Sequence, residues 1–162
     1  KYLIFRTSWV VGSYGGNFAR TMLYLASQRS ELKVVSDQFG APTAAALIAD
    51  VTSHVIRQVW PSIEDADASS AYQGIYHLVA SGVTNWHEYA CHVIDRALDA
   101  SQPITVAPDA VLQIKTKDYP TPAKRPQNSR LDTKKITDTF GLLMPDWRDG
   151  VDHILDQLFQ QR

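Results

Sequence analysis

The sequence predicts an α/β fold, and two observations carry this prediction. Short apolar stretches rich in β-branched and aromatic residues alternate with longer segments whose apolar residues recur at helical spacing. The first stretch, residues 2–11, is apolar at both odd and even positions, which is typical of a strand buried on both faces of a parallel sheet. A chain of 162 residues, 44% of them hydrophobic, fits one domain with a core of its own.

The first half of the chain predicts two helices after this strand. Asn17 can cap a helix over residues 18–27, because its side chain can accept a hydrogen bond from the first turn. A short strand is predicted at residues 32–35. Thr43 can cap the next helix, over residues 44–59, whose apolar residues fall on one face.

The second half repeats the alternation. A strand is predicted at residues 74–79, followed by a helix that Thr84 or Asn85 can cap, with Glu88 placed for a capping box from Asn85. The remaining predicted elements are a strand at residues 104–106, a proline-stiffened loop at 119–126, a short helix from Asp132 or Thr133 that Gly141 ends, and a last helix that opens at Pro145.

Charge and composition exclude several classes of function. The formal net charge is −1 and no basic cluster is long, which argues against nucleic-acid or membrane-surface binding. No apolar run approaches the ~20 residues of a membrane span. The single cysteine, Cys91, cannot form an internal disulfide, which fits the reducing cytoplasm. His87 and Cys91 share a helical face, but two ligands are too few for a metal site.

Three segments offer candidate ligand-binding residues. Thr7, Ser8 and Trp9 follow the first strand, and ligands of open α/β sheets bind outside the carboxyl ends of strands. Trp9 could stack on a sugar or a base, or it could be a packing residue. The glycine turn before Asn17 places backbone N–H groups at a helix N-terminus, where a phosphate can bind, although any tight turn uses glycines. Lys124 and Arg125 lie on the proline-rich loop and could hold a diphosphate or be solvated.

Four motifs, in this order, make the chain resemble a known family. They are RTSWVVG at residues 6–12, DQFGAPT at 37–43, YHLVASG at 76–82 and YPTPAKRPQNSRL at 119–131. Together they resemble the dTDP-4-dehydrorhamnose reductases, a family of the extended short-chain dehydrogenase/reductase superfamily. The resemblance covers essentially the whole chain but only the carboxyl-terminal part of a family member. It implies a partial Rossmann-like, doubly wound α/β fold.

The resemblance also implies an activity and a set of site residues. The family reduces the C4 keto group of dTDP-4-dehydro-L-rhamnose with NADPH or NADH and yields dTDP-L-rhamnose. Trp9 matches a family Trp that contacts the nucleotide sugar, with Thr7 and Ser8 beside it. Asn17 and Arg125 are expected to hold the diphosphate. The sequence departs from the family at Val11, where a Tyr is usual, and at Ala46, where some relatives carry an acidic metal ligand.

The cofactor half of such an enzyme is not recognisable in residues 1–162. None of the seven tyrosines has a Lys four residues later, and no glycine-rich dinucleotide fingerprint opens a strand–helix unit. We therefore expect residues 1–162 to be the substrate-binding portion, inactive alone, which associates as a homodimer or by strand swapping. Two other interpretations remain open: a non-catalytic regulatory subunit of the same fold, and a nucleotide-sugar epimerase or dehydratase.

Overall fold

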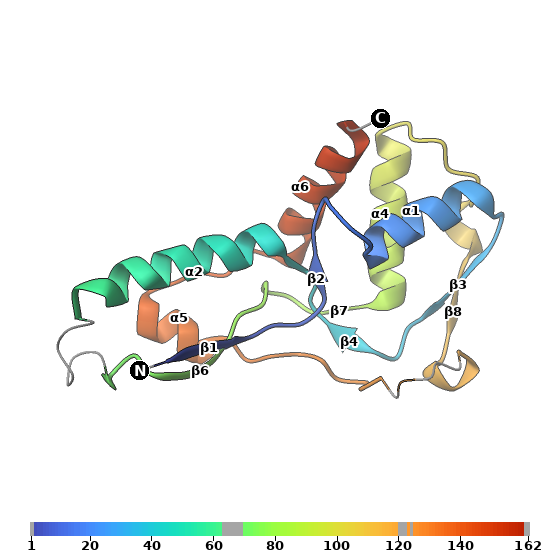
Figure 1. Ribbon diagram of the computed structural model, residues 1–162. Coiled ribbons are helices and arrows are strands. Elements are labelled where there is room, and N and C mark those ends of the chain that lie inside the picture. The colour runs from blue at the N-terminus through green and yellow to red at the C-terminus, as the bar shows by residue number, and fades with distance from the viewer. Residues whose placement is uncertain (1, 63–69, 120–122, 124, 161–162) are drawn as a thin grey trace.

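A computed structural model describes residues 2–62, 70–119, 123 and 125–160, and it confirms the α/β prediction. The elements form two groups, each with its own hydrophobic core, joined by two very short strand pairs (Figure 1). None of the helices in the described ranges has the length and apolar character needed to cross a membrane.

The first group is a two-stranded parallel sheet covered by helices. Strand β1 (Leu3–Arg6) pairs with β6 (Gly74–His77), and helices α2 (Ala45–Val59) and α5 (Lys134–Phe140) lie near it, with the 3-10 turn η1 (Trp60–Ser62) after α2. The buried residues of this core are Val51, Val55, Tyr76, Leu78, Ile136, Phe140 and Met144.

The predicted single strand over residues 2–11 is wrong in two respects. It is broken after Arg6, and the chain resumes as β2 (Val10–Val11), because Trp9 adopts the left-handed backbone conformation with φ of 49°. It is also not buried on both faces. Ile4 is 46% exposed and its register partner Ile75 is 41% exposed, since the described helices cover only the opposite face of this sheet.

The second group packs three helices beside another parallel strand pair. Helices α1 (Phe18–Gln28), α4 (Trp86–Asp99) and α6 (Trp147–Gln160) surround a core next to β3 (Leu32–Val35) and β8 (Val111–Ile114). The core includes Ala19, Met22, Leu23, Val34, Tyr89, Val93, Ile94, Trp147, Val151 and Leu155.

Two of the predicted helix caps are confirmed. The Oδ1 atom of Asn17 accepts a hydrogen bond from the Arg20 amide at 3.0 Å and caps α1. In the same way, Asn85 caps α4 through the Glu88 amide, also at 3.0 Å. Each cap satisfies a backbone donor that the first helical turn leaves without a partner.

Two other local predictions are wrong. Thr43 does not cap α2. It lies in the short strand β5 (Thr43–Ala44), fully buried, where its Oγ1 donates to the Ala41 carbonyl and accepts from the Ala80 amide. Residues 104–106 form no strand, because the Thr105 and Val106 amides both donate to the carbonyl of Ala26 in α1. The strand of this region is β8 instead.

Two short strand pairs and two 3-10 turns complete the fold. Strand β2 pairs with β5 in parallel, and β4 (Phe39–Gly40) pairs with β7 (Thr84–Asn85) in antiparallel orientation. The turns are η2 (Pro108–Ala110) and η3 (Thr116–Asp118), on either side of β8. The short pairs lie between the two groups and fix the start of α4 beside Trp9 and Gly40 (Figure 1).

Candidate functional site

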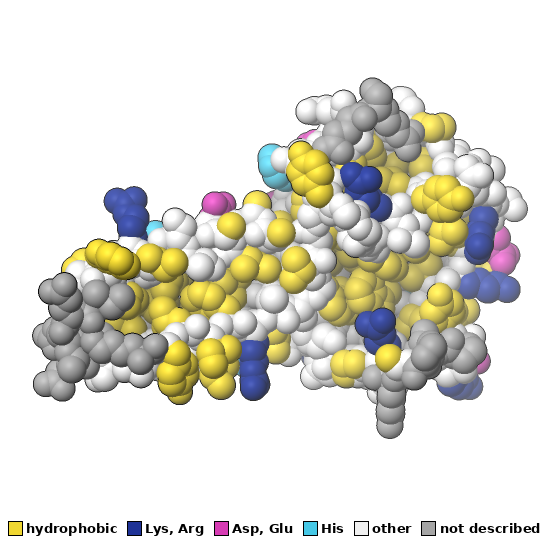
Figure 2. Space-filling model, viewed as in Figure 1, with side chains coloured by type: hydrophobic (Ala, Val, Ile, Leu, Met, Phe, Trp, Pro, Cys, Tyr) yellow, Lys and Arg dark blue, Asp and Glu magenta, His cyan; other side chains and the backbone are white. Residues whose placement is uncertain are grey.

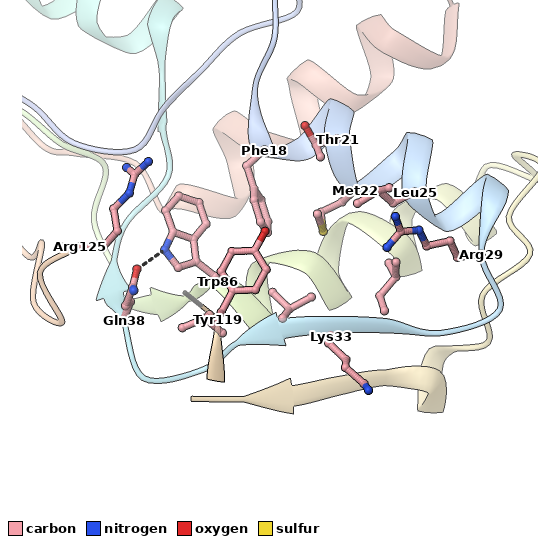
Figure 3. Close-up of a pocket in the computed structure, with 13 residues that line it drawn as sticks. Phe18, Thr21, Met22, Leu25, Arg29, Lys33, Gln38, Trp86, Tyr119 and Arg125 are labelled. Atoms are coloured by element: carbon pink, nitrogen blue, oxygen red, sulfur yellow. Dashed lines mark hydrogen bonds between the residues drawn. The ribbon is translucent and has the colours of Figure 1, made fainter. Parts of the chain in front are cut away.

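A cavity of about 400 Å³ opens between α1 and β3, within the size range of small-molecule sites. Figure 2 shows hydrophobic side chains in the hollow beneath α1, and Figure 3 shows the residues that line it. The lining residues are Phe18, Thr21, Met22, Leu25, Arg29, Leu32, Lys33, Val34, Val35, Gln38, Trp86, Tyr119 and Arg125.

The cavity is apolar within and cationic at its ends. Side chains of α1 and β3 form the apolar surface, whereas Arg29 and Arg125 lie at opposite ends of it, with Trp86 and Tyr119 between them (Figure 3). No carboxylate is found among the described lining residues. Such a site suits a ligand that combines a flat ring with an anionic group, because guanidinium groups bind phosphate oxygens in pairs.

Trp86 forms the aromatic wall of the cavity. As the first residue of α4 it is fixed in place by the Asn85 cap, and its ring packs on Phe18 with centroids 4.6 Å apart. Its indole nitrogen donates a hydrogen bond to Gln38 Oε1 at 3.1 Å (Figure 3). Neither Trp86 nor Gln38 was among the site residues predicted from the sequence. The available signals were the position of Trp86 directly after a helix cap and that of Gln38 within the DQFGAPT motif.

Trp9 lies behind this wall rather than in the cavity. Its indole stacks on that of Trp86, with centroids 3.7 Å apart and planes 18° from parallel. Gly40 lies against the indole of Trp9. Trp9 therefore packs directly against a residue that lines the cavity, and its contact with a nucleotide sugar stays a prediction.

Thr7 and Ser8 occupy the break between β1 and β2. Thr7 is exposed, and Ser8 Oγ donates to the carbonyl of Ser129 at 3.2 Å. This bond ties the break to the segment that follows the proline-rich loop, four residues after Arg125. Neither side chain is part of the cavity lining.

Asn17 uses its side chain to hold the preceding loop. Besides capping α1, its Nδ2 atom donates to the Gly12 carbonyl at 2.7 Å. Arg20 supports the same loop through a hydrogen bond from Nη2 to the Ser13 carbonyl. A role of Asn17 in holding a diphosphate stays a prediction.

Only part of the predicted cation pair is described. Arg125 lines the cavity, whereas Lys124 and residues 120–122 lie outside the described residues. The structure thus brings Arg125 to the same cavity as Trp86, although the two are far apart in the sequence.

His87 and Cys91 point toward one another, with Cys91 Sγ 3.7 Å from His87 Nε2. The same imidazole nitrogen lies 2.9 Å from the Val111 carbonyl oxygen, which ties α4 to β8. Burial, together with the nearby Asp95 carboxylate, raises the pKa of the Cys91 thiol. Across residues 2–62, 70–119, 123 and 125–160, no cluster of three or more His, Cys, Asp or Glu residues could hold a metal ion.

The chain is similar in sequence and in structure to known reductases. The chain is 50% identical over 159 residues to a dTDP-4-dehydrorhamnose reductase of Shigella flexneri and 49% identical to one of Escherichia coli K12, in each case across 98% of this chain. It superimposes with a TM-score of 0.76 and 31% identity on the Bacillus anthracis dTDP-4-dehydrorhamnose reductase solved with NADP, over 97% of this chain and 48% of that one.

The chain spans about half the length of the curated relatives that it matches, 50% of each of these two. Residues 1–160 match the family model of the RmlD substrate binding domain. This match runs through α1, β3, Trp86 and Arg125, the parts that build the cavity. Because the match includes nearly every residue, the chain belongs to the RmlD substrate binding domain family.

Proposed function

We propose that this chain is the nucleotide-sugar-binding portion of a dTDP-4-dehydrorhamnose reductase, acting in the cytoplasm in dTDP-rhamnose biosynthesis. The complete enzyme would reduce the C4 keto group of dTDP-4-dehydro-L-rhamnose with NADPH or NADH. The observation that carries the proposal is the cavity between α1 and β3, which has an apolar interior, an aromatic wall and an arginine at each end. The identity to named reductases across almost all of the chain supports it.

The cavity suggests where each part of the nucleotide sugar binds. The thymine and deoxyribose fit the apolar surface beside Trp86 and Phe18, since aromatic faces favour stacking with a flat base. The diphosphate fits Arg125, whose guanidinium can donate to two oxygens at once. Asn17 would support it from the start of α1.

The sugar then lies toward Trp9 and the break after β1. Thr7 is exposed there, so its hydroxyl is available to orient the polar groups of a sugar, and Ser8 Oγ, which donates to Ser129, can still accept a hydrogen bond. In this arrangement, the residues of the chain bind and orient the substrate, and such positioning lowers a barrier by removing the entropy cost of encounter.

The cofactor would be held mainly by the amino-terminal portion of such a reductase. Among the described residues of this chain, the cavity lining lacks the glycine-rich turn that approaches a dinucleotide pyrophosphate. When bound, NADPH or NADH supplies the hydride that C4 accepts. Every role that we assign to residues 1–162 is therefore binding or orientation.

Turnover assays test the proposal. Residues 1–162 alone should not reduce dTDP-4-dehydrorhamnose, whereas the same chain joined to the amino-terminal portion of a reductase should oxidise NADPH when that sugar is added. In the joined protein, Arg125→Ala and Trp9→Ala should raise KM, and His92→Ala should not, because His92 contacts Asp152 of α6 and does not line the cavity. Turnover by residues 1–162 alone would contradict the proposal that this chain binds the substrate and the amino-terminal portion holds the cofactor. A joined protein that binds the sugar without reducing it would favour the regulatory subunit, and isomerisation or loss of water would favour an epimerase or dehydratase.

The outer face of the β1–β6 sheet provides a surface for a partner. Tyr2, Ile4 and Ile75 are exposed there, and β1 has β6 as its one strand partner within the described residues. Figure 2 shows hydrophobic side chains over this region. We assign this surface to the cofactor-binding portion of the complete protein. In its absence, a second copy of the chain would cover the surface, as a homodimer or by strand swapping.

A further inference from the structure

Four side chains next to the cavity form a continuous series of hydrogen bonds. The indole nitrogen of Trp86 donates to Gln38 Oε1 at 3.1 Å, and Gln38 Nε2 donates to Thr116 Oγ1 at 3.1 Å. The Thr116 hydroxyl donates in turn to Asp37 Oδ1 at 2.6 Å, and the Thr116 amide donates to the same oxygen at 2.9 Å. The series therefore runs in one direction, from the indole of Trp86 to the carboxylate of Asp37.

This direction fixes the orientation of the Gln38 amide. A flipped amide would set its NH2 group against the indole N–H, so that two donors would face each other. Gln38 is only 8% exposed, and a buried amide that loses its partners pays a large desolvation cost. Asp37 anchors the series, since the two hydrogen bonds from Thr116 lower the pKa of its carboxyl and keep it an acceptor.

Gln38 joins two walls of the cavity that come from distant parts of the chain. On one side, it holds the edge of the Trp86 ring. On the other, it holds Thr116, the first residue of η3, the turn that leads directly to Tyr119. Figure 3 shows Trp86 and Tyr119 close together in the cavity, with Gln38 bonded to the indole.

Trp9 is held in turn by its contacts with Trp86 and Gly40. The two indoles are stacked at 3.7 Å, and Gly40 lies against the Trp9 ring, so Trp9 cannot follow a rotation of Trp86 without moving the β4 backbone. Since Gly40 already restrains Trp9, a side chain that fixes the orientation of Trp86 fixes the angle between the two rings.

We propose that Gln38 is a positioning residue for nucleotide-sugar binding, which holds the Trp86–Trp9 pair at a fixed angle and joins it to the Thr116–Tyr119 wall. The part of this proposal that concerns affinity rests on the proposed function. The part that concerns the aromatic pair does not, because it depends only on the hydrogen bonds and stacking of this chain.

Circular dichroism tests the aromatic pair without any ligand. Two stacked indoles couple their electronic transitions and give a paired band in the far ultraviolet. Trp9→Phe and Trp86→Phe should each abolish this band. Trp60→Phe should leave the band unchanged, because the side chain of Trp60 is 66% exposed. Gln38→Leu should reduce the band strongly. A wild-type protein without the band, or a Gln38→Leu protein with the full band, would overturn the proposal.

Changes at Thr116 separate positioning from general stability. Thr116→Val removes the hydroxyl at nearly constant volume, so it should reduce the band. Thr116→Ser keeps the hydroxyl and should therefore keep a band of wild-type strength. Gln157→Leu is the matched control, because among the described residues the hydrogen-bond partner of Gln157 is His153 of its own helix α6, at 3.1 Å. If Thr116→Val and Thr116→Ser change the band equally, the hydroxyl does not carry the effect and the proposal fails.

Titration calorimetry with dTDP-rhamnose then tests affinity, on the complete protein. We expect Gln38→Leu to weaken binding about tenfold relative to both wild type and Gln157→Leu. A variant that loses the band and binds as tightly as wild type would show that the pair is not a positioning device. If wild type itself does not bind, the proposed function fails, whereas the circular dichroism result still decides whether Gln38 holds the aromatic pair.

Discussion

Gly40 and Trp9 are packed so closely that no side chain fits between them. A Cβ atom on Gly40 would lie 2.7 Å from Cε2 of Trp9 and 3.0 Å from Cδ2 and Cζ2. Real Cβ contacts are longer than this, so an added methyl group must displace the ring or the β4 backbone. The DQFGAPT motif thus contains a glycine whose lack of a side chain makes room for the aromatic pair.

Gly40→Ala should therefore destabilise the protein by about 1–3 kcal/mol, the usual cost of overpacking. It should also disturb the Trp9–Trp86 stack. Urea unfolding measures the first effect, and circular dichroism of the indole pair measures the second. Gly16→Ala is the matched control, because among the described residues other than its chain neighbours no atom lies within 4 Å of a Cβ at Gly16. Equal effects of the two substitutions would rule out the steric explanation.

Replacement of Asn17 should destabilise the protein, because its side chain makes two hydrogen bonds to the backbone. Asn17→Ala removes both the cap on the Arg20 amide and the bond to the Gly12 carbonyl, so we expect a loss of about 1 kcal/mol or more in the free energy of unfolding. Asn17→Ser keeps a capping oxygen and should recover most of the loss. Thermal unfolding of the three proteins provides the comparison. If Ser is as destabilising as Ala, the Gly12 bond matters more than the cap.

The Asp37–Thr116 contact predicts a specific pH dependence. The hydrogen bonds from Thr116 lower the pKa of Asp37 below its ordinary value of 3.8. A carboxyl with a lowered folded-state pKa stabilises the fold fully above pH 3.8, and this contribution is lost as the pH falls through the lowered value. Stability should thus decline at acidic pH, in part because Asp37 becomes protonated.

Thr116→Val tests this assignment. The variant should be less stable than wild type at neutral pH, and the difference should shrink as the solution is acidified below the ordinary Asp pKa. Urea denaturation over a pH series measures it, with Thr116→Ser as the control that retains the hydroxyl. A constant difference between wild type and Thr116→Val at every pH would mean that the Asp37 charge plays no part.

The exposed face of the β1–β6 sheet predicts self-association of the isolated chain. Ile4 and Ile75 are neighbours in register, and both are more than 40% exposed, so their apolar surface gains from being covered. Light scattering should detect dimers or larger species at high micromolar concentration. Ile4→Lys should shift the protein toward monomer, and Leu143→Lys, at an isolated exposed position, should not. A wild-type chain that remains monomeric contradicts the prediction.

Addition of the amino-terminal portion of a reductase provides a second test of that surface. If the cofactor-binding portion and a second copy use the same face, the added portion should lower the fraction of dimer. A dimer that persists unchanged alongside the bound portion would place the self-association elsewhere.

Local features were predictable from the sequence wherever one or two residues decide the conformation. Asn17 and Asn85 were expected to cap helices and do so, and Gly141 ends α5 with a φ of 62°. Each of these outcomes depends on a side chain and a backbone only a few residues away, so neighbouring sequence contains the whole cause.

Features that depend on distant partners were not predictable in this way. The sequence of residues 2–11 does not reveal that Trp9 turns to meet Trp86, nor that the described helices cover one face of β1 only. The same distinction between local and distant causes applies to the residues of the candidate site. Arg125 was selected because of its own loop, whereas Gln38 and Trp86 gain their importance from bonds between segments that only the fold brings together.

The strand pairs have a consequence for biosynthesis of the protein. Strand β1 pairs with β6, and β3 pairs with β8, so each of these two strands has a partner that is made much later in the chain. Contacts between distant segments form slowly, because long loops must close first. Within the described residues, β1 gains its strand partner only when Gly74–His77 are made, after α1 and α2. A nascent chain that ends before Gly74 can therefore form the short β2–β5 pair, but neither of the two four-residue parallel pairs.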